Sequence, residues 1–157
     1  MVFVSVTRLH LKSPLYLPAF LWHTSLSTWQ IINTPGFLGG KFLGDNRGGS
    51  WTLTVWEKQA AMKHYRNSGA HRRVMPSIQN WCDEAAVVHW EQTNSNFPTW
   101  EEIHRRMIAE GHITRLSQPC AAHLEKKIPS PSSESLARIL RPRKKMPPRV
   151  VESQPNS

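Results

Sequence analysis

Cysteine is scarce in this chain, and long apolar runs are missing altogether. The two cysteines, Cys82 and Cys120, form neither a C-x-x-C metal motif nor the framework of a disulfide-rich domain. No apolar stretch approaches the roughly 18 residues that a membrane-spanning helix needs. Residues 1–6 are followed at once by polar and charged residues, which argues against a signal peptide. We therefore expect a soluble, cytoplasmic protein with no membrane insertion.

Motifs for phosphates and metals are also missing. Gly39-Gly40-Lys41 lacks the Ser or Thr that closes a phosphate-binding loop, and strand-like residues follow it where a helix would be needed. His64 and His71 stand on opposite sides of a glycine break, which is not the spacing of metal ligands on one helix. We therefore expect no metal site and no nucleotide-binding loop.

Acidic residues are few, with 11 Asp and Glu against 20 Lys and Arg, but the excess is uneven. From Leu116 onward there are eight Lys/Arg and three Asp/Glu, which is +5 of the total of +9. The preceding part is only mildly basic, which argues against a nucleic-acid-binding fold. The basic run 141–145 could contact nucleic acid or an anionic membrane by charge alone, but no aromatic residues interleave with it, so a solvated tail is the simpler interpretation.

The pattern of apolar residues predicts four strands. Residues 2–11 and 50–56 alternate as strands do, with β-branched and aromatic residues prominent. Residues 37–45 predict a strand loosened by glycines, which the turn 45–49 joins to the next strand as a hairpin. Asp83-Glu84 is expected to turn the chain into a last strand over 85–90.

Helical spacing fills the intervals between these strands. A first helix after Ser13-Pro14 carries an apolar stripe that we expect to face the sheet, made of Leu15, Ala19, Trp22, Leu26 and Trp29. Residues 58–66 and 70–81 predict two helices separated by Asn67-Ser68-Gly69. The T-x-x-E pattern at Thr99 predicts an appended helix, which ends at Gly111 and packs on the domain edge.

The order strand, helix, strand, strand, helix, strand is that of an α+β ferredoxin-like domain, with an antiparallel sheet and helices on one face. Arg8 and His10, near the end of the first strand, are expected at its solvent-exposed rim. The sheet face that carries Thr52, Thr54 and Trp56 is mixed in character, and we expect a second copy of the chain to bury it.

Three regions follow from composition. Residues 1–92 form the ferredoxin-like domain, and 93–123 form the appended helix and its extension. Residues 124–157 are rich in Pro, Ser and basic residues, so a disordered tail is expected there. Deletion after Leu124 should then leave the stability nearly unchanged.

Several short segments carry a resemblance: WTLTVWE at 51–57, YRNSGAH at 65–71 and WCDEA at 81–85, together with FLWH at 20–23, PGFLGG at 35–40 and PTWEE at 98–102. They resemble bacterial proteins of the dimeric α/β-barrel superfamily, in particular relatives of antibiotic-biosynthesis monooxygenases and of spheroidene monooxygenase. The resemblance covers about residues 2–123 and implies a homodimeric barrel. It does not fix the reaction, because superfamily members include cofactor-free oxygenases, haem-binding enzymes, isomerases and proteins without known activity.

A cofactor-free oxygenase of this type needs a base that makes the substrate anion, and histidine suits that task near neutral pH. His71, just after the glycine break, is the first candidate base; Arg66 would hold the oxyanion, and His23 is a further candidate. Each has a structural alternative. His71 and His23 could be satisfied hydrogen-bonding residues, and Arg66 could pair with Glu57 or Asp83.

Tryptophans would supply the flat apolar walls of the substrate pocket, for which the candidates are Trp22, Trp51 and Trp81. We therefore expect a monooxygenase-like protein that acts on an aromatic or polyunsaturated small molecule without a cofactor. Haem held by an axial histidine is an alternative. A non-catalytic, dimeric ligand-binding or interaction protein of the same fold is the alternative function, and it would lack a closed apolar pocket with a perturbed histidine.

Overall fold

The computed structural model describes residues 1–132 and 137–143, and it contains one antiparallel sheet in the order β5-β4-β1-β3-β2-β6. Its strands are β1 (Val2–Leu11), β2 (Phe37–Gly44), β3 (Ser50–Trp56), β4 (Cys82–Gln92), β5 (His112–Ile113) and β6 (Arg138–Leu140). The inner four strands have the ferredoxin-like order, so the predicted fold class is confirmed. Asp83 and Glu84, expected in a turn, lie inside β4 instead.

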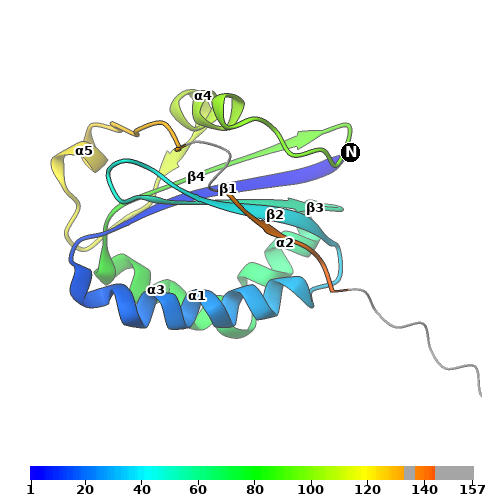
Figure 1. Ribbon diagram of the computed structural model, residues 1–157, viewed down its shortest axis with the longest axis horizontal. Helices are drawn as coiled ribbons and strands as arrows, with labels where there is room; N and C mark the ends of the chain where they lie inside the picture. The colour runs from blue at the N-terminus through cyan, green and yellow to red at the C-terminus, as the bar shows by residue number, and fades with distance from the viewer. Residues whose placement is uncertain (133–136, 144–157) are drawn as a thin grey trace, which may run out of the picture.

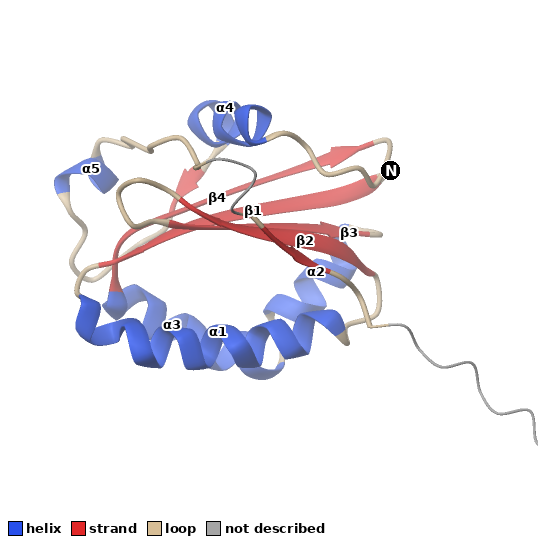
Figure 2. Cartoon of the chain, in the orientation of Figure 1, coloured by secondary structure: helices blue, strands red, loops and turns tan. Residues whose placement is uncertain are grey.

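Helices cover both faces of the sheet (Figures 1 and 2). On one face lie α1 (Leu17–Ile32), preceded by the short η1 (Pro14–Tyr16), α2 (Gln59–Arg66) and α3 (Gly69–Trp81). On the other lie α4 (Trp100–Glu110) and the short α5 (Ala121–Leu124). The appended helix α4 therefore does not pack at the domain edge as expected. It covers the sheet face opposite α1–α3.

Each face of the sheet has its own core. The strongly apolar face, with Val6, Leu53 and Val88 at its centre, packs against Trp100, Ile103 and Met107 of α4. The mixed face packs against the other three helices. Its buried residues there are Phe3, Ile31, Phe37, Trp56 and Met62 at one end and Val74, Ile78, Cys82, Ala85 and Leu116 at the other.

This arrangement corrects the expected position of the dimer interface. The mixed face with Thr54 and Trp56 was expected to meet a second copy, but α1, α2 and α3 of the same chain cover it. Alternation along the strands shows which residues share a face, but it does not show which helix packs there. The most apolar face receives α4, and the mixed face receives the three helices that carry more polar inner residues.

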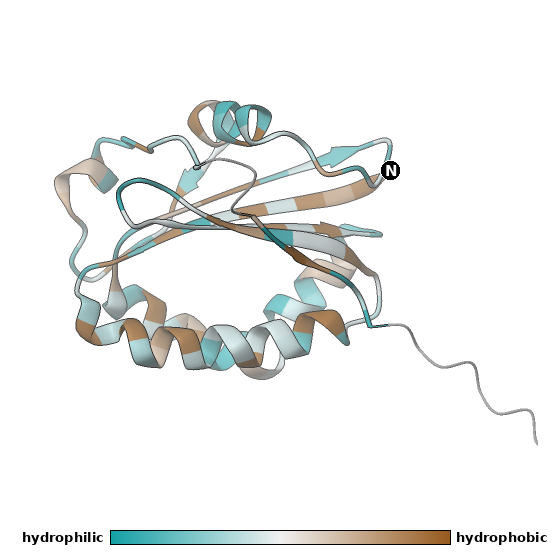
Figure 3. Ribbon diagram, viewed as in Figure 1, coloured by the Kyte–Doolittle hydropathy of each residue, from teal (hydrophilic) through white to brown (hydrophobic). Residues whose placement is uncertain are grey.

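The apolar stripe of α1 also differs from expectation. Trp22 and Trp29 are 64% and 65% exposed, and Leu26 is exposed as well. The inward side of α1 carries instead the half-buried Phe20 and His23, and the buried Ile31. Hydrophobic residues recur along the whole of α1 in Figure 3. The most regular apolar stripe of this helix is thus on its outer side.

Part of the expected disordered tail is ordered. β6 pairs antiparallel with β2 through Gly40–Leu140, Lys41–Ile139 and Phe42–Arg138, and Pro131 forms a bridge with Asp45. Ile128 and Ala137 pack against the core beneath α4. The remaining parts of that prediction, 133–136 and 144–157, lie outside the described residues. Among the helices that are described, none is both long and apolar enough to cross a membrane.

Candidate functional site

The break between α2 and α3 is held in place by a side chain from α1. Gly69 opens α3 with φ of 57°, a left-handed conformation that glycine adopts without strain. Gln30 Nε2 donates to the carbonyl oxygens of Tyr65 and Ser68 at 3.1 and 2.9 Å, and its Oε1 accepts from the N–H of His71 at 2.9 Å. One amide therefore satisfies backbone groups on both sides of the break, and it fixes where α3 begins.

His71 is oriented by the same break. Its Nδ1 lies 3.2 Å from the carbonyl oxygen of Arg66. Because a carbonyl oxygen only accepts, Nδ1 carries the proton and the lone pair of the neutral ring is on Nε2. The ring packs against that of Tyr65, with 4.7 Å between centroids.

Burial lowers the pKa of His71, and the nearby charge of Arg66 lowers it as well. The hydrogen bond to the Arg66 carbonyl oxygen raises the pKa by less, so the net direction is downward. A pKa below the ordinary value favours the neutral imidazole at pH 7. Among the described residues, Nε2 has no hydrogen-bond partner, and an oriented, neutral imidazole with an available Nε2 is the state that a general base requires.

A polar row on the sheet lies on the same side as the helix break. His89 of β4 stands opposite Ser5 of β1, and Ser5 stands opposite Thr54 of β3. The Thr54 hydroxyl donates to the Ser5 carbonyl oxygen at 3.2 Å, and the Trp56 indole N–H donates to Thr54 Oγ1 at 3.0 Å. His89 thus lies on the mixed sheet face that was expected to meet a second copy of the chain, and α1–α3 cover that face instead.

His89 shares an electrostatic environment with His71. Burial lowers the pKa of His89, and the Arg66 charge lowers it further. Arg66 itself is exposed, and its Nε donates to Asn67 Oδ1 at 3.3 Å. The Asp83 carboxylate, which was considered as a partner for Arg66, pairs with His10 Nδ1 at 2.6 Å instead. Arg66 therefore provides positive charge near two neutral imidazoles.

Solvent reaches the space between the sheet and the three helices. Thr7 and Thr52 face this space from the middle of the central strands β1 and β3, yet both are only half-buried. Val87 and His89 of β4 are half-buried in the same way. Residues in the middle of a sheet that helices cover are normally sealed, so their partial exposure shows that the helices leave this part of the sheet accessible to solvent.

His23 and Trp81 lie together at the other end of this space. Their ring centroids are 5.7 Å apart, and Tyr16 stacks on Trp81 at 6.3 Å. His71 lies in the first turn of α3 and Trp81 ends the helix, so at about 1.5 Å of rise per residue the two are roughly 15 Å apart along it. The structure thus brings His71 close to Arg66, and His23 close to Trp81, but it does not bring the two pairs into one cluster.

The other two predicted pocket residues lie elsewhere. Trp22 is on the outer side of α1. Trp51 is fully buried on the face covered by α4, and its indole N–H donates to Asp45 Oδ2 at 2.9 Å. Neither lines the space that holds His71.

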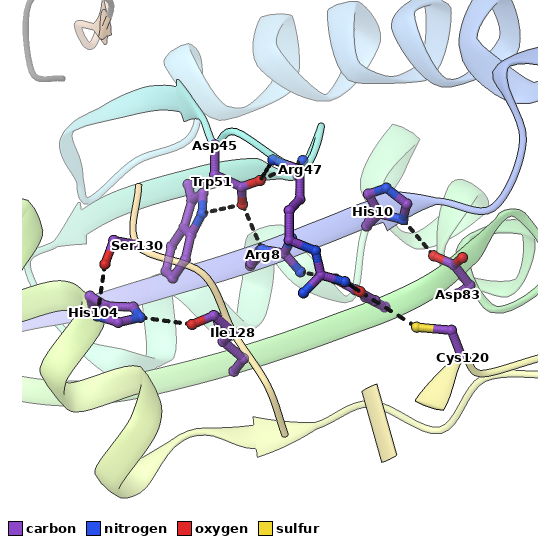
Figure 4. A network of polar contacts seen from close by, with 12 residues as sticks. Arg8, His10, Asp45, Arg47, Trp51, Asp83, His104, Cys120, Ile128 and Ser130 are labelled. Carbon is purple, nitrogen blue, oxygen red and sulfur yellow. Dashed lines mark hydrogen bonds and ion pairs between the residues drawn. The ribbon is translucent and has the colours of Figure 1, made fainter. Parts of the chain in front are cut away.

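Trp51 belongs to a buried charge network that sequence reasoning missed (Figure 4). Arg8, expected at an exposed rim, is 2% exposed and pairs with Asp45 through Nε–Oδ2 at 2.7 Å and with Glu84 through Nη1. Arg47 Nη2 pairs with the other Glu84 oxygen at 2.6 Å. Burial raises the pKa of the Asp45 carboxyl. The hydrogen bonds from Arg8 and Gly49 lower it, and the net direction is downward. Two arginines balance two carboxylates, so the cluster is suited to stabilising the fold.

A separate cavity of about 1080 Å³ opens beside α4. It is lined by residues that include Lys41, Phe97, Trp100, His104, Ile108 and Ser130. His104 Nε2 donates to the carbonyl oxygen of Ile128 at 2.8 Å, so this ring nitrogen is already hydrogen-bonded (Figure 4). None of the predicted site residues lines this cavity. In the described part of the chain, no group of three or more His, Cys, Asp or Glu could hold a metal ion.

Comparison with known proteins gives a fold but no closer relative. No protein-family model matches the chain, and no curated protein matches it. Among solved structures, it is similar to a candidate antibiotic biosynthesis monooxygenase from Nitrosomonas europaea, with 13% identity, a TM-score of 0.53, and coverage of 61% of this chain and 94% of that one.

Two further structures give the same result. Rv0793 from Mycobacterium tuberculosis has 10% identity and a TM-score of 0.55, with coverage of 62% of this chain and all of that one. An antibiotic biosynthesis monooxygenase has 16% identity and a TM-score of 0.52, with coverage of 60% and 100%. The chain therefore has the fold seen in these antibiotic biosynthesis monooxygenase structures.

Proposed function

We propose that the chain is a monooxygenase-like enzyme that oxidises an aromatic or polyunsaturated small molecule without a cofactor, with His71 as its base and Arg66 as the group that stabilises the anion. The observation that carries this proposal is the state of His71: a neutral imidazole whose Nδ1–H is held by a carbonyl oxygen. Its location beside the solvent-accessible space supports the proposal, as does the fold shared with antibiotic biosynthesis monooxygenases.

The reaction balances without an external reductant. His71 Nε2 removes a proton from an acidic C–H or phenolic O–H group of the substrate, and the nearby Arg66 charge stabilises the resulting anion. The electron-rich anion reduces O₂. When a CH₂ group becomes a carbonyl, one oxygen atom enters the substrate, and the other leaves as water with the two hydrogens that the carbon loses. The substrate itself supplies the electrons.

His23 and Trp81 have a different role in this proposal. They lie at the far end of the same space, where their rings would contact the apolar end of a long substrate. A substrate that reaches from His71 to Trp81 would have to extend about 15 Å along α3. This length favours a polycyclic aromatic or a conjugated polyene over a single ring.

The proposed homodimer cannot form through an uncovered face of the sheet and needs another surface. In the described residues, α1–α3 cover one face and α4 covers the other. A dimer built through the sheet would therefore require α4 to leave its place on the apolar face. Light scattering of the purified protein measures the mass directly, and it should be repeated after α4 is loosened by the substitution Met107→Ala.

The experiment that tests the enzymatic proposal is oxygen uptake with a panel of probes: an anthrone, a naphthol, a hydroquinone and a conjugated polyene that carries an acidic C–H group. His71→Ala should abolish uptake for any probe that the wild type oxidises, and Arg66→Ala should raise KM. His64→Ala is the matched control, because His64 is an exposed histidine of the preceding helix. Circular dichroism must show that all variants are folded.

Three results would contradict the proposal. If His71→Ala retained full turnover, the assigned base would be wrong. If the probes bound tightly and no oxygen were consumed, the chain would be a ligand-binding protein of the same fold. An absorption spectrum with a Soret band would replace the cofactor-free mechanism with a haem-based one.

A further inference from the structure

The outer surface of η1 and α1 is a strip of exposed apolar side chains. Six large hydrophobic residues of this segment are exposed, from 38% for Leu26 to 87% for Leu15: Leu15, Leu17, Leu21, Trp22, Leu26 and Trp29. The polar group among them, the Ser25 hydroxyl, donates to the Leu21 carbonyl oxygen at 2.9 Å and is thus already paired. The strip is on the order of several hundred Å², at or above the largest patch that a typical monomer leaves exposed to water.

The helical layer that carries this strip has no carboxylate of its own. The sequences of α1, α2 and α3 contain no Asp or Glu. The same helices carry exposed Lys63, Arg66, Arg72 and Arg73. α1 packs directly against α3, so the exposed arginines of α3 belong to the same helical layer as the apolar strip. An acidic residue, Glu57, precedes α2 by two positions and lies outside the three helices.

Two partners could cover an apolar strip of this size, and the charges distinguish them. A second copy that docked through α1 would bring two rows of positive charge together around the contact, which is unfavourable. An anionic lipid surface would neutralise those charges while its acyl region buried the Leu and Trp side chains. Tryptophan is also the residue type that is enriched at the membrane–water boundary.

We propose that the outer face of α1 docks on an anionic lipid surface, with Trp22 and Trp29 in the interface and the exposed basic residues of α2 and α3 other than Arg66 against the headgroups. This is adsorption to the surface and needs no spanning helix. The sheet and α4 would point away from the lipid, because they lie on the other side of α1 (Figure 1). The basic run 141–145 is a different part of the sequence from this strip. The strip would bind lipid through its apolar area and through the charges of α2 and α3.

The test uses the full chain and sedimentation with vesicles of phosphatidylcholine alone or mixed with phosphatidylglycerol. We expect binding to the mixed vesicles that falls as salt is raised, because screening weakens the ionic part. The variant Trp22→Ala/Trp29→Ala should lower that affinity at least tenfold, and Arg72→Gln/Arg73→Gln should lower it several-fold.

Matched controls are available on the other surfaces. Ile108→Ala/Ile139→Ala removes exposed apolar residues outside the helical layer, and Arg115→Gln/Arg138→Gln removes exposed charges there. Both should bind as the wild type does. The tail is present in every variant, so binding through the tail alone would leave Trp22→Ala/Trp29→Ala unaffected and would overturn the proposal. A wild-type dimer that this variant converts to a monomer, with no vesicle binding, would assign the strip to a second copy instead.

Discussion

Single residues show where the chain places its charge, and Arg8 is the clearest case. It sits on the same strand face as Val4 and Val6, within an apolar row, and its guanidinium is buried between two carboxylates. Its neighbours in space, Asp45 and Glu84, are far away in sequence. The alternation along the first strand puts Arg8 on the same face as Val4 and Val6. The residues that bury Arg8 at this end of the strand come after α4, and no local pattern could predict that they pack there.

The Arg8 network gives a first prediction. Arg8→Ala should lower the free energy of unfolding by about 3–5 kcal/mol, because it leaves two carboxylates in a buried site without their cation. Arg47→Ala removes a half-exposed partner of the same Glu84 and should cost less than about 1 kcal/mol. Denaturant titration of both variants measures the difference. Equal losses of unfolding free energy in the two variants would show that burial of Arg8 does not make its ion pairs more important for stability than that of Arg47.

The histidines of the site predict how stability depends on pH. The pKa of His71 and that of His89 are both lowered in the folded state, so the unfolded chain binds more protons in the acid range. Stability is therefore complete above the unfolded pKa of about 6.5, and it falls as the pH drops below that value. His71→Gln should make this fall smaller, with the His89 part remaining.

Thermal unfolding between about pH 5 and pH 8 measures that dependence. His64→Gln is the control, and it should leave the slope as in the wild type. A wild-type stability that rises on acidification through this range would mean that the site histidines are stabilised in their charged form. That outcome would contradict the assignment of His71 as a neutral base.

Among the secondary structure elements, the local patterns located most strands and helices, apart from the turn expected at Asp83-Glu84, but they did not identify the packing partners of α1 and α4. The strand predicted over 50–56 is β3, and the break at 67–69 separates α2 from α3 as expected. The inner side of α1 was misassigned because it faces a half-polar sheet surface and so carries His23 and Gln30 among its contact residues. A rule that places the most apolar stripe inward fails when the opposing surface is itself polar.

α4 is an integral part of the core, and this gives a further prediction. Met107 is fully buried beneath the helix, whereas its neighbour Ile108 is 44% exposed. Met107→Ala should lower the free energy of unfolding by about 2–5 kcal/mol, because it leaves a cavity between α4 and the sheet. Ile108→Ala should change it by less than about 1 kcal/mol. If Met107→Ala were equally mild, α4 would contribute little to the core.

At the scale of the whole molecule, the ferredoxin-like unit could be predicted because its strand and helix order is written in local periodicity. The closure of its second face could not, because the helix pattern of α4 does not show where that helix packs, and Ile128 and β6 come from a segment whose composition indicates a tail. The fold thus completes both faces within one chain. The site is confined to the side where Ser5, Thr7 and Thr54 keep the sheet polar, which is also the side of the broken helix.

The extension after α5 allows a test of this view. Truncation after Leu124 removes β6 from the sheet edge and Ile128 from the core, so the melting temperature should fall by about 2–4 °C for each kcal/mol lost. This reverses the expectation drawn from composition alone. Ile139→Ala, at an exposed position of β6, is the control and should have little effect. An unchanged melting temperature after truncation would restore the original expectation.

The proposed base must be a neutral His71 whose Nε2 carries the lone pair. Long-range ¹H–¹⁵N NMR of the histidine rings, with His71 assigned by comparison with His71→Gln, tests this directly. We predict a neutral ring at pH 7 with the proton on Nδ1, and a pKa below the ordinary value of about 6.5. A charged ring at pH 7, or a neutral ring with the proton on Nε2, would contradict it.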